Sequence, residues 1–250
     1  MQRKTVGILV LAGLLRAQSV VPGNGGLVSY ADEAYIGDRL VDEHFFRVTE
    51  GTSFRTATGR AEVLLGPCAA VWVDEKSAFR MISTDLDDIR LEVLGGSVMV
   101  AAGTMPRGTK LTIMLKTSAA LIDRKGAYRM DAMPARLKVL AGRTTVQRED
   151  GTFPVNTDRW LSLDTPDGAH KFDKSDRDPF DTWSKGRAAL LSRLAREKTE
   201  IPQKPAAPPT PADMDNVRTV VRSKSSPEHV PALPPPMPAS SPSGCGVSPW

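Results

Sequence analysis

The sequence predicts a mainly β domain: an irregular β-solenoid or β-sandwich of stacked hairpins, followed by one C-terminal amphipathic α-helix and a disordered tail. Short runs rich in Val, Leu and Ile fill residues 27–168, Gly- and Pro-containing turns separate them, and no helical period persists there. The expected segments are a signal peptide (1–19), an all-β domain (20–172), a helix docked on that domain (173–200) and a Pro-rich tail (201–250).

The N-terminal residues are typical of an export signal. Arg3 and Lys4 precede the ten-residue apolar run 6–15, and the small and polar residues 17–19 follow it. Because a bilayer crossing needs about 20 apolar residues, this run is too short for a membrane helix. We therefore expect a bacterial protein that is periplasmic or secreted, without an integral span after cleavage. A retained anchor and a buried helix of a cytosolic protein remain alternatives.

Charge gives little support for a nucleic-acid partner. Removal of residues 1–19 takes away three of the 33 basic residues and none of the 29 acidic ones, which leaves a formal charge of +1. No basic face or basic run studded with aromatic residues is present, so no nucleic-acid partner is expected.

The chain has two cysteines, Cys68 in an apolar strand pattern and Cys245 in the tail. Export would permit a disulfide between them. A partner on a disordered tail argues against one, so the sequence favours Cys68 as a small buried hydrophobic residue.

One pattern recurs along the β region. Residues 90–96 match residues 136–142 and, more loosely, residues 60–66, with starts 46 and 30 residues apart. Each unit alternates a charged outward residue with aliphatic inward ones and ends at a small-residue turn. The unequal spacing argues against a regular solenoid and favours irregular hairpins that share one apolar core, with chance similarity among hairpins as the alternative.

A helix is predicted after the β region. Asp178 can cap it, Pro179 suits its first position, and Asp181 lies in its acidic first turn. We expect Arg187 to interrupt the apolar stripe, with its stem along the core and its head in water. Docking on the β core is favoured over binding of a hydrophobic partner. The predicted stripe comprises Phe180, Trp183, Leu190, Leu191 and Leu194, flanked by Ala188.

Thirteen of the 20 prolines follow residue 200. Such a segment does not form a packed core and is expected to be solvated and partly polyproline II. An inert tail is favoured over a spacer or a ligand for a proline-binding groove.

The search for reactive groups predicts no catalytic, cofactor-binding or metal residue, no cofactor, and therefore no enzyme. The histidines, His44, His170 and His229, are far from metal-ligand spacing to one another or to Cys68. Two acidic clusters lack the Gly and distal Glu of a calcium loop. These clusters are Asp85, Asp87 and Asp88, and Asp173, Asp176 and Asp178.

Residues 56–77 and 91–100 resemble the FecR domain. The shared pattern is a strand after a Thr-x-x-Gly turn, a second aliphatic strand closed by a Ser, and a later strand pair joined at a Leu-x-x-Gly turn. The resemblance covers residues 28–150, and the helix at 178–194 is similar to one that ends exported relatives. It implies an all-β periplasmic domain with a protein-contact role.

The namesake regulator of that family holds a sigma factor through a cytoplasmic segment and spans the inner membrane. We expect neither segment here, so sigma-factor control is not expected to carry over.

The main hypothesis is a non-catalytic FecR-like envelope domain that binds or scaffolds a protein, or a cell-wall glycan such as peptidoglycan or another polysaccharide, through sheet edges and loops. One alternative is a signal-transduction component related to FecR-type sigma regulators that acts with a separate membrane partner. A second is a cell-wall hydrolase that uses Asp42, Glu43 and Asp131.

Overall fold

The computed structural model describes residues 25–41, 46–66, 68–173 and 175–200, together with the single residues Val247 and Trp250. The predicted signal peptide and nearly all of the predicted tail lie outside the described residues. Within the described part, the chain forms two nine-stranded sheets and one helix. The prediction of a mainly β fold with a C-terminal helix is confirmed.

The two sheets, named A and B here, contain equal numbers of the described strands. Sheet A contains β1 (Gly26–Ala31), β4 (Arg47–Val48), β6 (Ala61–Leu65), β7 (Ala69–Val73), β10 (Ser97–Ala102), β13 (Gly126–Ala132), β14 (Ala135–Ala141), β17 (Arg159–Ser162) and β18 (His170–Lys171). Sheet B contains β2 (Ala34–Ile36), β3 (Arg39–Leu40), β5 (Ser53–Thr56), β8 (Ala78–Asp85), β9 (Asp88–Gly95), β11 (Lys110–Leu115), β12 (Ser118–Ile122), β15 (Arg143–Arg148) and β16 (Gly151–Asn156).

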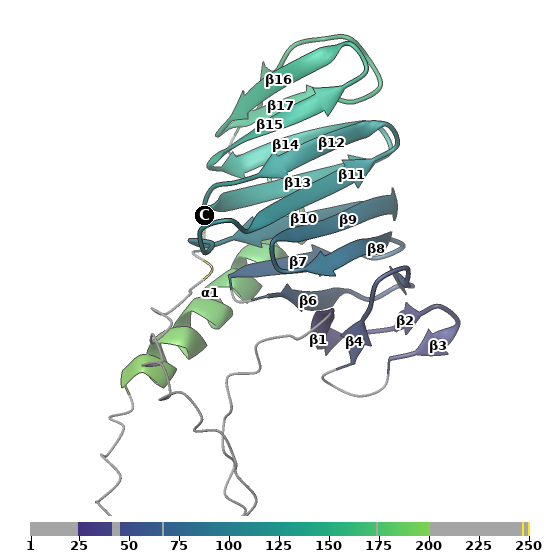
Figure 1. Ribbon diagram of the computed structural model, residues 1–250, viewed down its shortest axis with the longest axis vertical. Coiled ribbons are helices and arrows are strands. Elements are labelled where there is room, and N and C mark those ends of the chain that lie inside the picture. Colours follow the sequence, from purple (N-terminus) through teal and green to yellow (C-terminus); the bar gives the residue numbers. More distant parts are fainter. Residues whose placement is uncertain (1–24, 42–45, 67, 174, 201–246, 248–249) are drawn as a thin grey trace, which may run out of the picture.

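The chain moves back and forth between the sheets as it ascends the molecule (Figure 1). Hairpin β6–β7 lies in sheet A, β8–β9 in sheet B, β13–β14 in sheet A and β15–β16 in sheet B. Strand pairing is antiparallel except between β9 and β11, which run parallel. The result is a β-sandwich built from hairpins in nearly sequential order, as the irregular spacing of the repeat predicts.

Glycines make the connections that end the repeated units. Gly96 (φ +69°) follows β9 and leads to β10 in the opposite sheet, and Gly142 (φ +85°) does the same between β14 and β15. Gly66 (φ +64°) instead ends β6 within the β6–β7 hairpin. All three residues have left-handed backbone angles, which glycine adopts without the steric cost that a Cβ brings. The Gly at the end of each repeated unit therefore meets the same requirement, a positive φ angle, in two kinds of connection.

The main core lies between the sheets. Alternate side chains of both sheets point inward and are buried, including Val71, Val100, Leu91, Ile113 and Tyr128. Each fully buried aliphatic side chain of this kind contributes about 1.5–3 kcal/mol relative to an exposed one.

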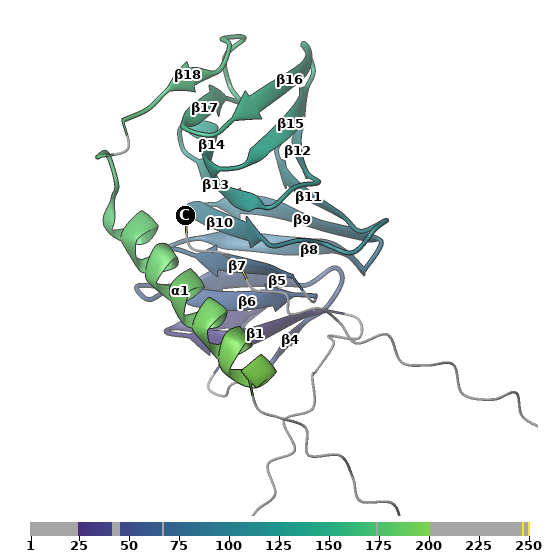
Figure 2. The ribbon, with the colours of Figure 1, turned by 90° about the vertical axis from the view of Figure 1, so that its left-hand side faces the viewer.

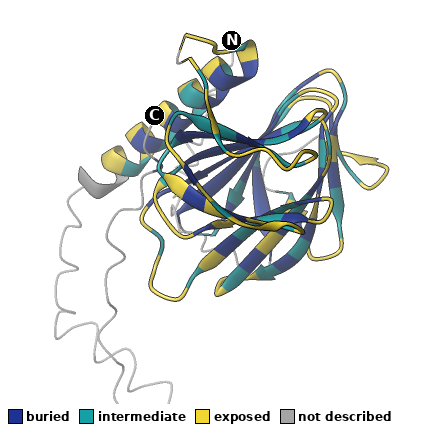
Figure 3. Cartoon of the chain, turned by 90° about the horizontal axis from the view of Figure 1, so that it is seen from above, coloured by how far each residue is buried: buried dark blue, intermediate teal, exposed yellow. Residues whose placement is uncertain are grey.

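The outer faces of the two sheets differ. Strands of sheet B alternate, as in β11 with Leu111, Ile113 and Leu115 buried and the residues between them partly or fully exposed. In contrast, every residue of β7 is buried. Figure 3 shows this difference, with α1 (Pro179–Glu200) lying outside the more deeply buried sheet.

Helix α1 crosses the strands of sheet A on its outer face (Figure 2). Its first residues follow the predicted cap, because the N–H of Asp181 donates to Asp178 Oδ1 at 2.8 Å. The buried line of the helix is narrower and more polar than the predicted stripe: Ser184, Ala188 and Ser192 are buried, whereas Leu194 is 50% exposed. Small residues at intervals of four allow the helix to approach the sheet closely. No helix in the described part is long and apolar enough for a bilayer crossing.

Candidate functional site

The outer face of sheet A carries charged residues that are buried beneath α1. One group, the Glu62 cluster, comprises Ser29, Glu62, Trp72 and Arg187. Glu62 is on β6 and directly opposite Trp72 on β7, and both are fully buried. Arg187 comes from α1. The cluster therefore joins the helix to the sheet.

Both oxygens of Glu62 are saturated with hydrogen bonds. Arg187 donates from Nε to Oε2 at 2.9 Å and from Nη2 to Oε1 at 2.8 Å, which is the bidentate geometry of a strong ion pair. The Trp72 indole donates to Oε2 at 2.8 Å, and Ser29 donates to Oε1 at 2.6 Å. The prediction that the head of Arg187 reaches into water is wrong, because it pairs with a buried carboxylate.

A second group, the helix-start cluster, lies beneath the N-terminal turn of α1. Arg129 on β13 donates to Asp131 at 2.7 Å, to Asp178 at 2.5 Å and to Asp181 at 2.9 Å. The cluster balances three cations with three carboxylates. Its members are Arg129, Arg136, Lys138, Asp131, Asp178 and Asp181.

These two clusters fix the direction of α1. The acidic first turn of the helix lies over Arg129 and Lys138, which are cross-strand neighbours on β13 and β14. Farther along the helix, Arg187 lies over Glu62 on β6, on the same face of sheet A. A reversed helix would place like charges together. Charge pairs of this kind specify an arrangement even where they add little net stability.

Asp131, proposed from the sequence as a hydrolase carboxylate, is an ion-paired residue of the helix-start cluster. Burial alone would raise its pKa, but the charge of Arg129 and hydrogen bonds from Arg136, Ser97 and Arg129 hold the pKa below its usual range. Because Arg129, Arg136 and Ser97 all donate to it, Asp131 is poorly placed to act as a general acid. Asp42 and Glu43 lie outside the described residues.

Other residues considered for chemistry are dispersed. His170 stacks on Trp160, with ring centroids 4.8 Å apart, and His44 and His229 lie outside the described residues. Asp178 is occupied by the helix cap and Arg129. Among the described residues, no group of three or more His, Cys, Asp or Glu side chains is arranged to hold a metal ion.

Cys68 is buried, as the sequence predicts, but its bonding state differs from the expectation. It is disulfide-bonded rather than a free thiol. The chain's other cysteine, Cys245, lies outside the described residues. The expectation failed because it treated the C-terminal end as separate from the domain, whereas Val247 and Trp250 pack on the outer face of sheet A.

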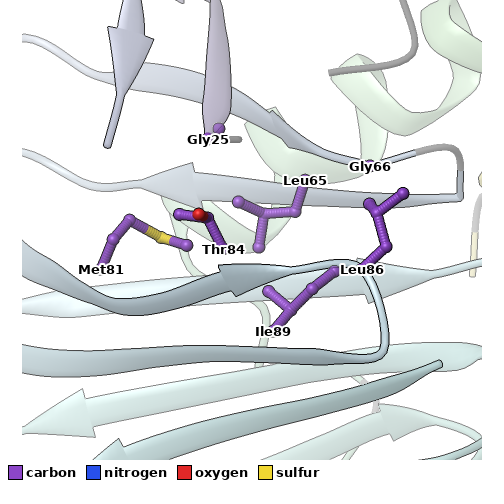
Figure 4. A pocket seen from close by; sticks show the side chains of 8 residues that line it. Gly25, Leu65, Gly66, Met81, Thr84, Leu86 and Ile89 are labelled. Carbon is purple, nitrogen blue, oxygen red and sulfur yellow. The ribbon is translucent and has the colours of Figure 1, made fainter. Parts of the chain in front are cut away.

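A small pocket opens between the sheets near the N-terminal end of the described chain (Figure 4). Leu65 and Gly66 line it from one side, and Met81, Leu86 and Ile89 line it from the other. Its cavity volume of about 10 Å³ is far below that of typical ligand sites, about 300–1,000 Å³. The Thr84 hydroxyl is its one side-chain polar group, so the pocket does not have the chemistry to orient a polar substrate.

The outer face of sheet B lies on the side of the molecule away from α1. Two cross-strand rows run over it. One contains Arg80, Glu92, Met114, Ala119 and Gln147, and the other Arg90, Thr112, Leu121 and Thr145. We call Met114, Ala119 and Leu121 the sheet B patch. Leu121 is 37% exposed, and Arg80 and Glu92 form an ion pair at 2.5 Å beside the patch.

The outermost strands are poorly suited to pairing with another strand. β3, β4 and β18 have two residues each, and β16 contains Pro154, which lacks an N–H donor. Short edges and edge prolines discourage strand addition. The edge strands in the described part are therefore poor sites for the strand addition that the sequence-based hypothesis invokes.

The comparisons with known proteins are limited. No family model matches the chain, and no curated protein matches it. Two solved structures from Parabacteroides distasonis, each described as a "putative anti-sigma factor", are similar to it at 13% and 14% identity, with TM-scores of 0.43 and 0.41. The alignments cover 59% and 56% of this chain and 74% and 64% of those chains.

Proposed function

We propose that this chain is a non-catalytic protein-binding domain of the bacterial envelope, related to the periplasmic part of FecR-type signalling systems. It would contact a separate membrane or envelope protein through the outer face of sheet B. The observation that carries this proposal is the contrast between the two outer faces: α1 buries the one on sheet A, whereas sheet B presents half-exposed apolar side chains flanked by charges.

The composition of the sheet B patch supports a protein partner. Apolar contacts surrounded by charged and polar side chains are typical of protein interfaces, in which the centre excludes water and the rim stays polar. Arg80, Glu92 and Arg90 supply such a rim around Met114 and Leu121. The two rows contain no aromatic side chain on which a sugar ring could stack.

A glycan partner has a different candidate surface. Trp160 and His170 are stacked on β17 and β18, and Lys138 lies 4.4 Å from the ring of Phe172 nearby. Because this aromatic surface lies on sheet A, substitutions can separate the two hypotheses. Trp160→Ala would weaken glycan binding and leave binding through sheet B unchanged.

The proposal is tested with Leu121→Arg and its matched control, Leu194→Arg, which adds the same charge to an exposed leucine of α1. A partner identified by co-purification with the unaltered protein from an envelope extract is purified, and its affinity is measured by titration. We expect Leu121→Arg to weaken binding by about tenfold or more, as for a central interface residue, and Leu194→Arg to leave it unchanged. Equal affinities of all three proteins would refute binding through the sheet B patch.

A further inference from the structure

The apolar residues of α1 do not all face sheet A. The buried line of the helix consists of Ser184, Ala188 and Ser192. A second line, which we call the α1 flank, consists of Trp183, Leu190 and Leu194. The flank lies about 140° around the helix from the buried line, because each residue turns an α-helix by about 100°. Trp183 and Leu190 are half-buried, and Leu194 is 50% exposed.

Ion pairs hold α1 in this rotation. Asp181 pairs with Arg129 at 2.9 Å, and Arg187 pairs with Glu62 at 2.8 Å. Both partners are on sheet A, so a helix that turned to bury its flank would break these pairs and leave buried charges uncompensated. The exposure of the α1 flank is therefore fixed by the charges beneath the helix.

The helix is longer than the sheet that it crosses. Arg187 lies over β6, and only β1 and β4 of the described strands follow β6 on that side of sheet A. Two strands span about 10 Å, whereas residues 188–200 of α1 extend about 20 Å. Figure 1 shows the last turns of α1 extending past the strands. Leu194 thus lies on a convex ridge that sheet A does not cover.

Cations border the flank. On α1, Arg193 and Arg196 are exposed and Lys185 is half-exposed. The one acidic residue among the exposed side chains of the described helix is Glu197. It lies 3.8 Å from Arg193, but 70% of the Arg193 side chain and 60% of the Glu197 side chain are exposed, so water screens this pair. Three cations against one acid give this surface a net charge of +2.

This composition is that of a helix at a membrane surface. Leucines enter the boundary between headgroups and acyl chains, tryptophan suits the headgroup level, and cations attract anionic lipids. A convex ridge can enter a deformable bilayer, whereas a rigid protein would need a matching groove. A second copy of this chain is less suitable, because two-fold symmetry would bring Arg193 and Arg196 of both copies into one interface.

We propose that the α1 flank is a peripheral contact with a bilayer that contains anionic lipid. The helix stays docked on sheet A through its ion pairs while Leu190 and Leu194 enter the headgroup region. Arg193 and Arg196 lie against the lipid phosphates. The contact is separate from the sheet B patch, which lies on the other side of the molecule, and it does not depend on a protein partner.

The test measures binding of the full chain to phosphatidylcholine vesicles by flotation, with and without phosphatidylglycerol at about a third of the lipid. We expect tighter binding to the anionic vesicles. Leu194→Ser should reduce this affinity by about fivefold or more, because fewer apolar groups enter the bilayer. The matched control, Leu121→Ser on sheet B, should leave it unchanged. The apolar run 6–15 is present in every variant and does not contribute to the difference.

The charges are tested with the double variant Arg193→Gln and Arg196→Gln. Its affinity for anionic vesicles should fall by about fivefold for each charge removed, and its affinity for pure phosphatidylcholine should not change. The control is the double variant Arg55→Gln and Arg90→Gln, which removes two cations from the outer face of sheet B. Circular dichroism spectra establish that each variant is folded.

Equal affinities of Leu194→Ser and Leu121→Ser for anionic vesicles would overturn the bilayer contact, as would equal losses in the two arginine double variants. If Leu194→Ser instead weakens binding only to a co-purified protein, the flank is a protein-binding ridge and the bilayer contact is refuted. Because the vesicle assay contains no protein partner, its failure would leave binding through the sheet B patch untouched.

Discussion

Buried charges determine how α1 meets sheet A at the level of single residues. Glu62 is fully buried and receives four hydrogen bonds, two of them from Arg187. Removal of one member of such a pair leaves an uncompensated charge in an apolar environment, which costs more than the pair itself contributes. Substitution of one member of the pair should therefore lower the free energy of unfolding more than substitution of both members.

Arg187→Met should lower the free energy of unfolding by about 3–5 kcal/mol, because Glu62 loses its charge partner. The double variant Glu62→Gln with Arg187→Met should be more stable than Arg187→Met alone, since the Gln carbonyl can still accept from the Trp72 indole. Urea unfolding curves measure both. The control is Arg193→Met in the exposed pair with Glu197, where the expected loss is below about 1 kcal/mol. Equal losses for Arg187→Met and Arg193→Met would contradict the role of the buried pair.

Asp131 gives the domain a predictable acid sensitivity. Burial opposes ionisation of Asp131, but the charge of Arg129 and the hydrogen bonds donated to the carboxylate stabilise its ionised form more strongly. The pKa of Asp131 is therefore lower in the folded state than its unfolded value of about 3.9. Its contribution to stability is therefore complete above about pH 4 and is lost as the pH falls through the lowered folded pKa. The pKa of Asp178 is lowered as well: burial would raise it, but the Asp181 N–H and Arg129 stabilise the carboxylate.

Asp131→Asn should be less stable than the unaltered protein near neutral pH, and the difference should narrow as the pH falls below about 4. Thermal unfolding at constant ionic strength across this range measures the effect. A stability difference that does not change with pH would show that the pKa of Asp131 is the same in the folded and unfolded states, which contradicts its lowering by Arg129.

The charged clusters could be predicted only in part from the sequence. Asp178 and Asp181 were assigned to the helix start, but their partner Arg129 comes from a strand about fifty residues earlier, and nothing local indicates the pairing. The available signal was the outward side of β7 and β10, where Ala70, Trp72 and Met99 stand at positions that are polar in a solvated sheet. An apolar outer face is covered by another element, and a charged residue on that face is then buried. Because an unpaired buried charge is costly, it needs a partner of opposite charge.

At the level of elements, the connections between sheets depend on backbone angles rather than on side chains. Gly96 lies between β9 in sheet B and β10 in sheet A at φ +69°. A Cβ there would be 2.6 Å from Ser77 Cα and 2.7 Å from the Lys76 carbonyl oxygen. At Gly95, a Cβ would meet no atom within 4 Å.

Gly96→Ala should therefore lower the free energy of unfolding by about 2 kcal/mol or more, since the left-handed angle alone costs about 1–2 kcal/mol and the backbone clash adds to it. Gly95→Ala, one residue earlier, is the matched control and should change stability by less than about 0.5 kcal/mol. Chemical denaturation of the two variants tests the difference. Similar free energies of unfolding for the two variants would mean that the connection between β9 and β10 tolerates a side chain at Gly96.

The elements themselves were largely predictable. Period-two alternation identified the strands, and the Asp178-Pro179 start identified α1, because both signals are local. The buried line of α1 was less predictable. Leucine positions suggested a stripe through Leu194, but the buried line runs through Ser184, Ala188 and Ser192. Which side of the helix faces the sheet depends on contacts with distant strands, such as that of Ala188 with the alanines of sheet A, and not on the helix alone.

The whole molecule is asymmetric, and this asymmetry carries the functional proposal. One outer face is covered by α1, with Val247 and Trp250 beside it, whereas the outer face of sheet B keeps the alternating pattern of a solvated sheet with an apolar patch at Met114, Ala119 and Leu121. The pairing of strands into two sheets, and hence which face is free, could not be predicted from the sequence because it depends on where each turn directs the chain.

Photo-crosslinking in living cells tests binding through the sheet B patch most directly. A photoreactive benzoylphenylalanine replaces Leu121 in one strain and Leu194 in another, and adducts are identified by mass spectrometry after irradiation. The account predicts a discrete adduct with one envelope protein from position 121 and none from position 194. The same adduct from both positions, or an adduct from position 194 alone, would contradict it.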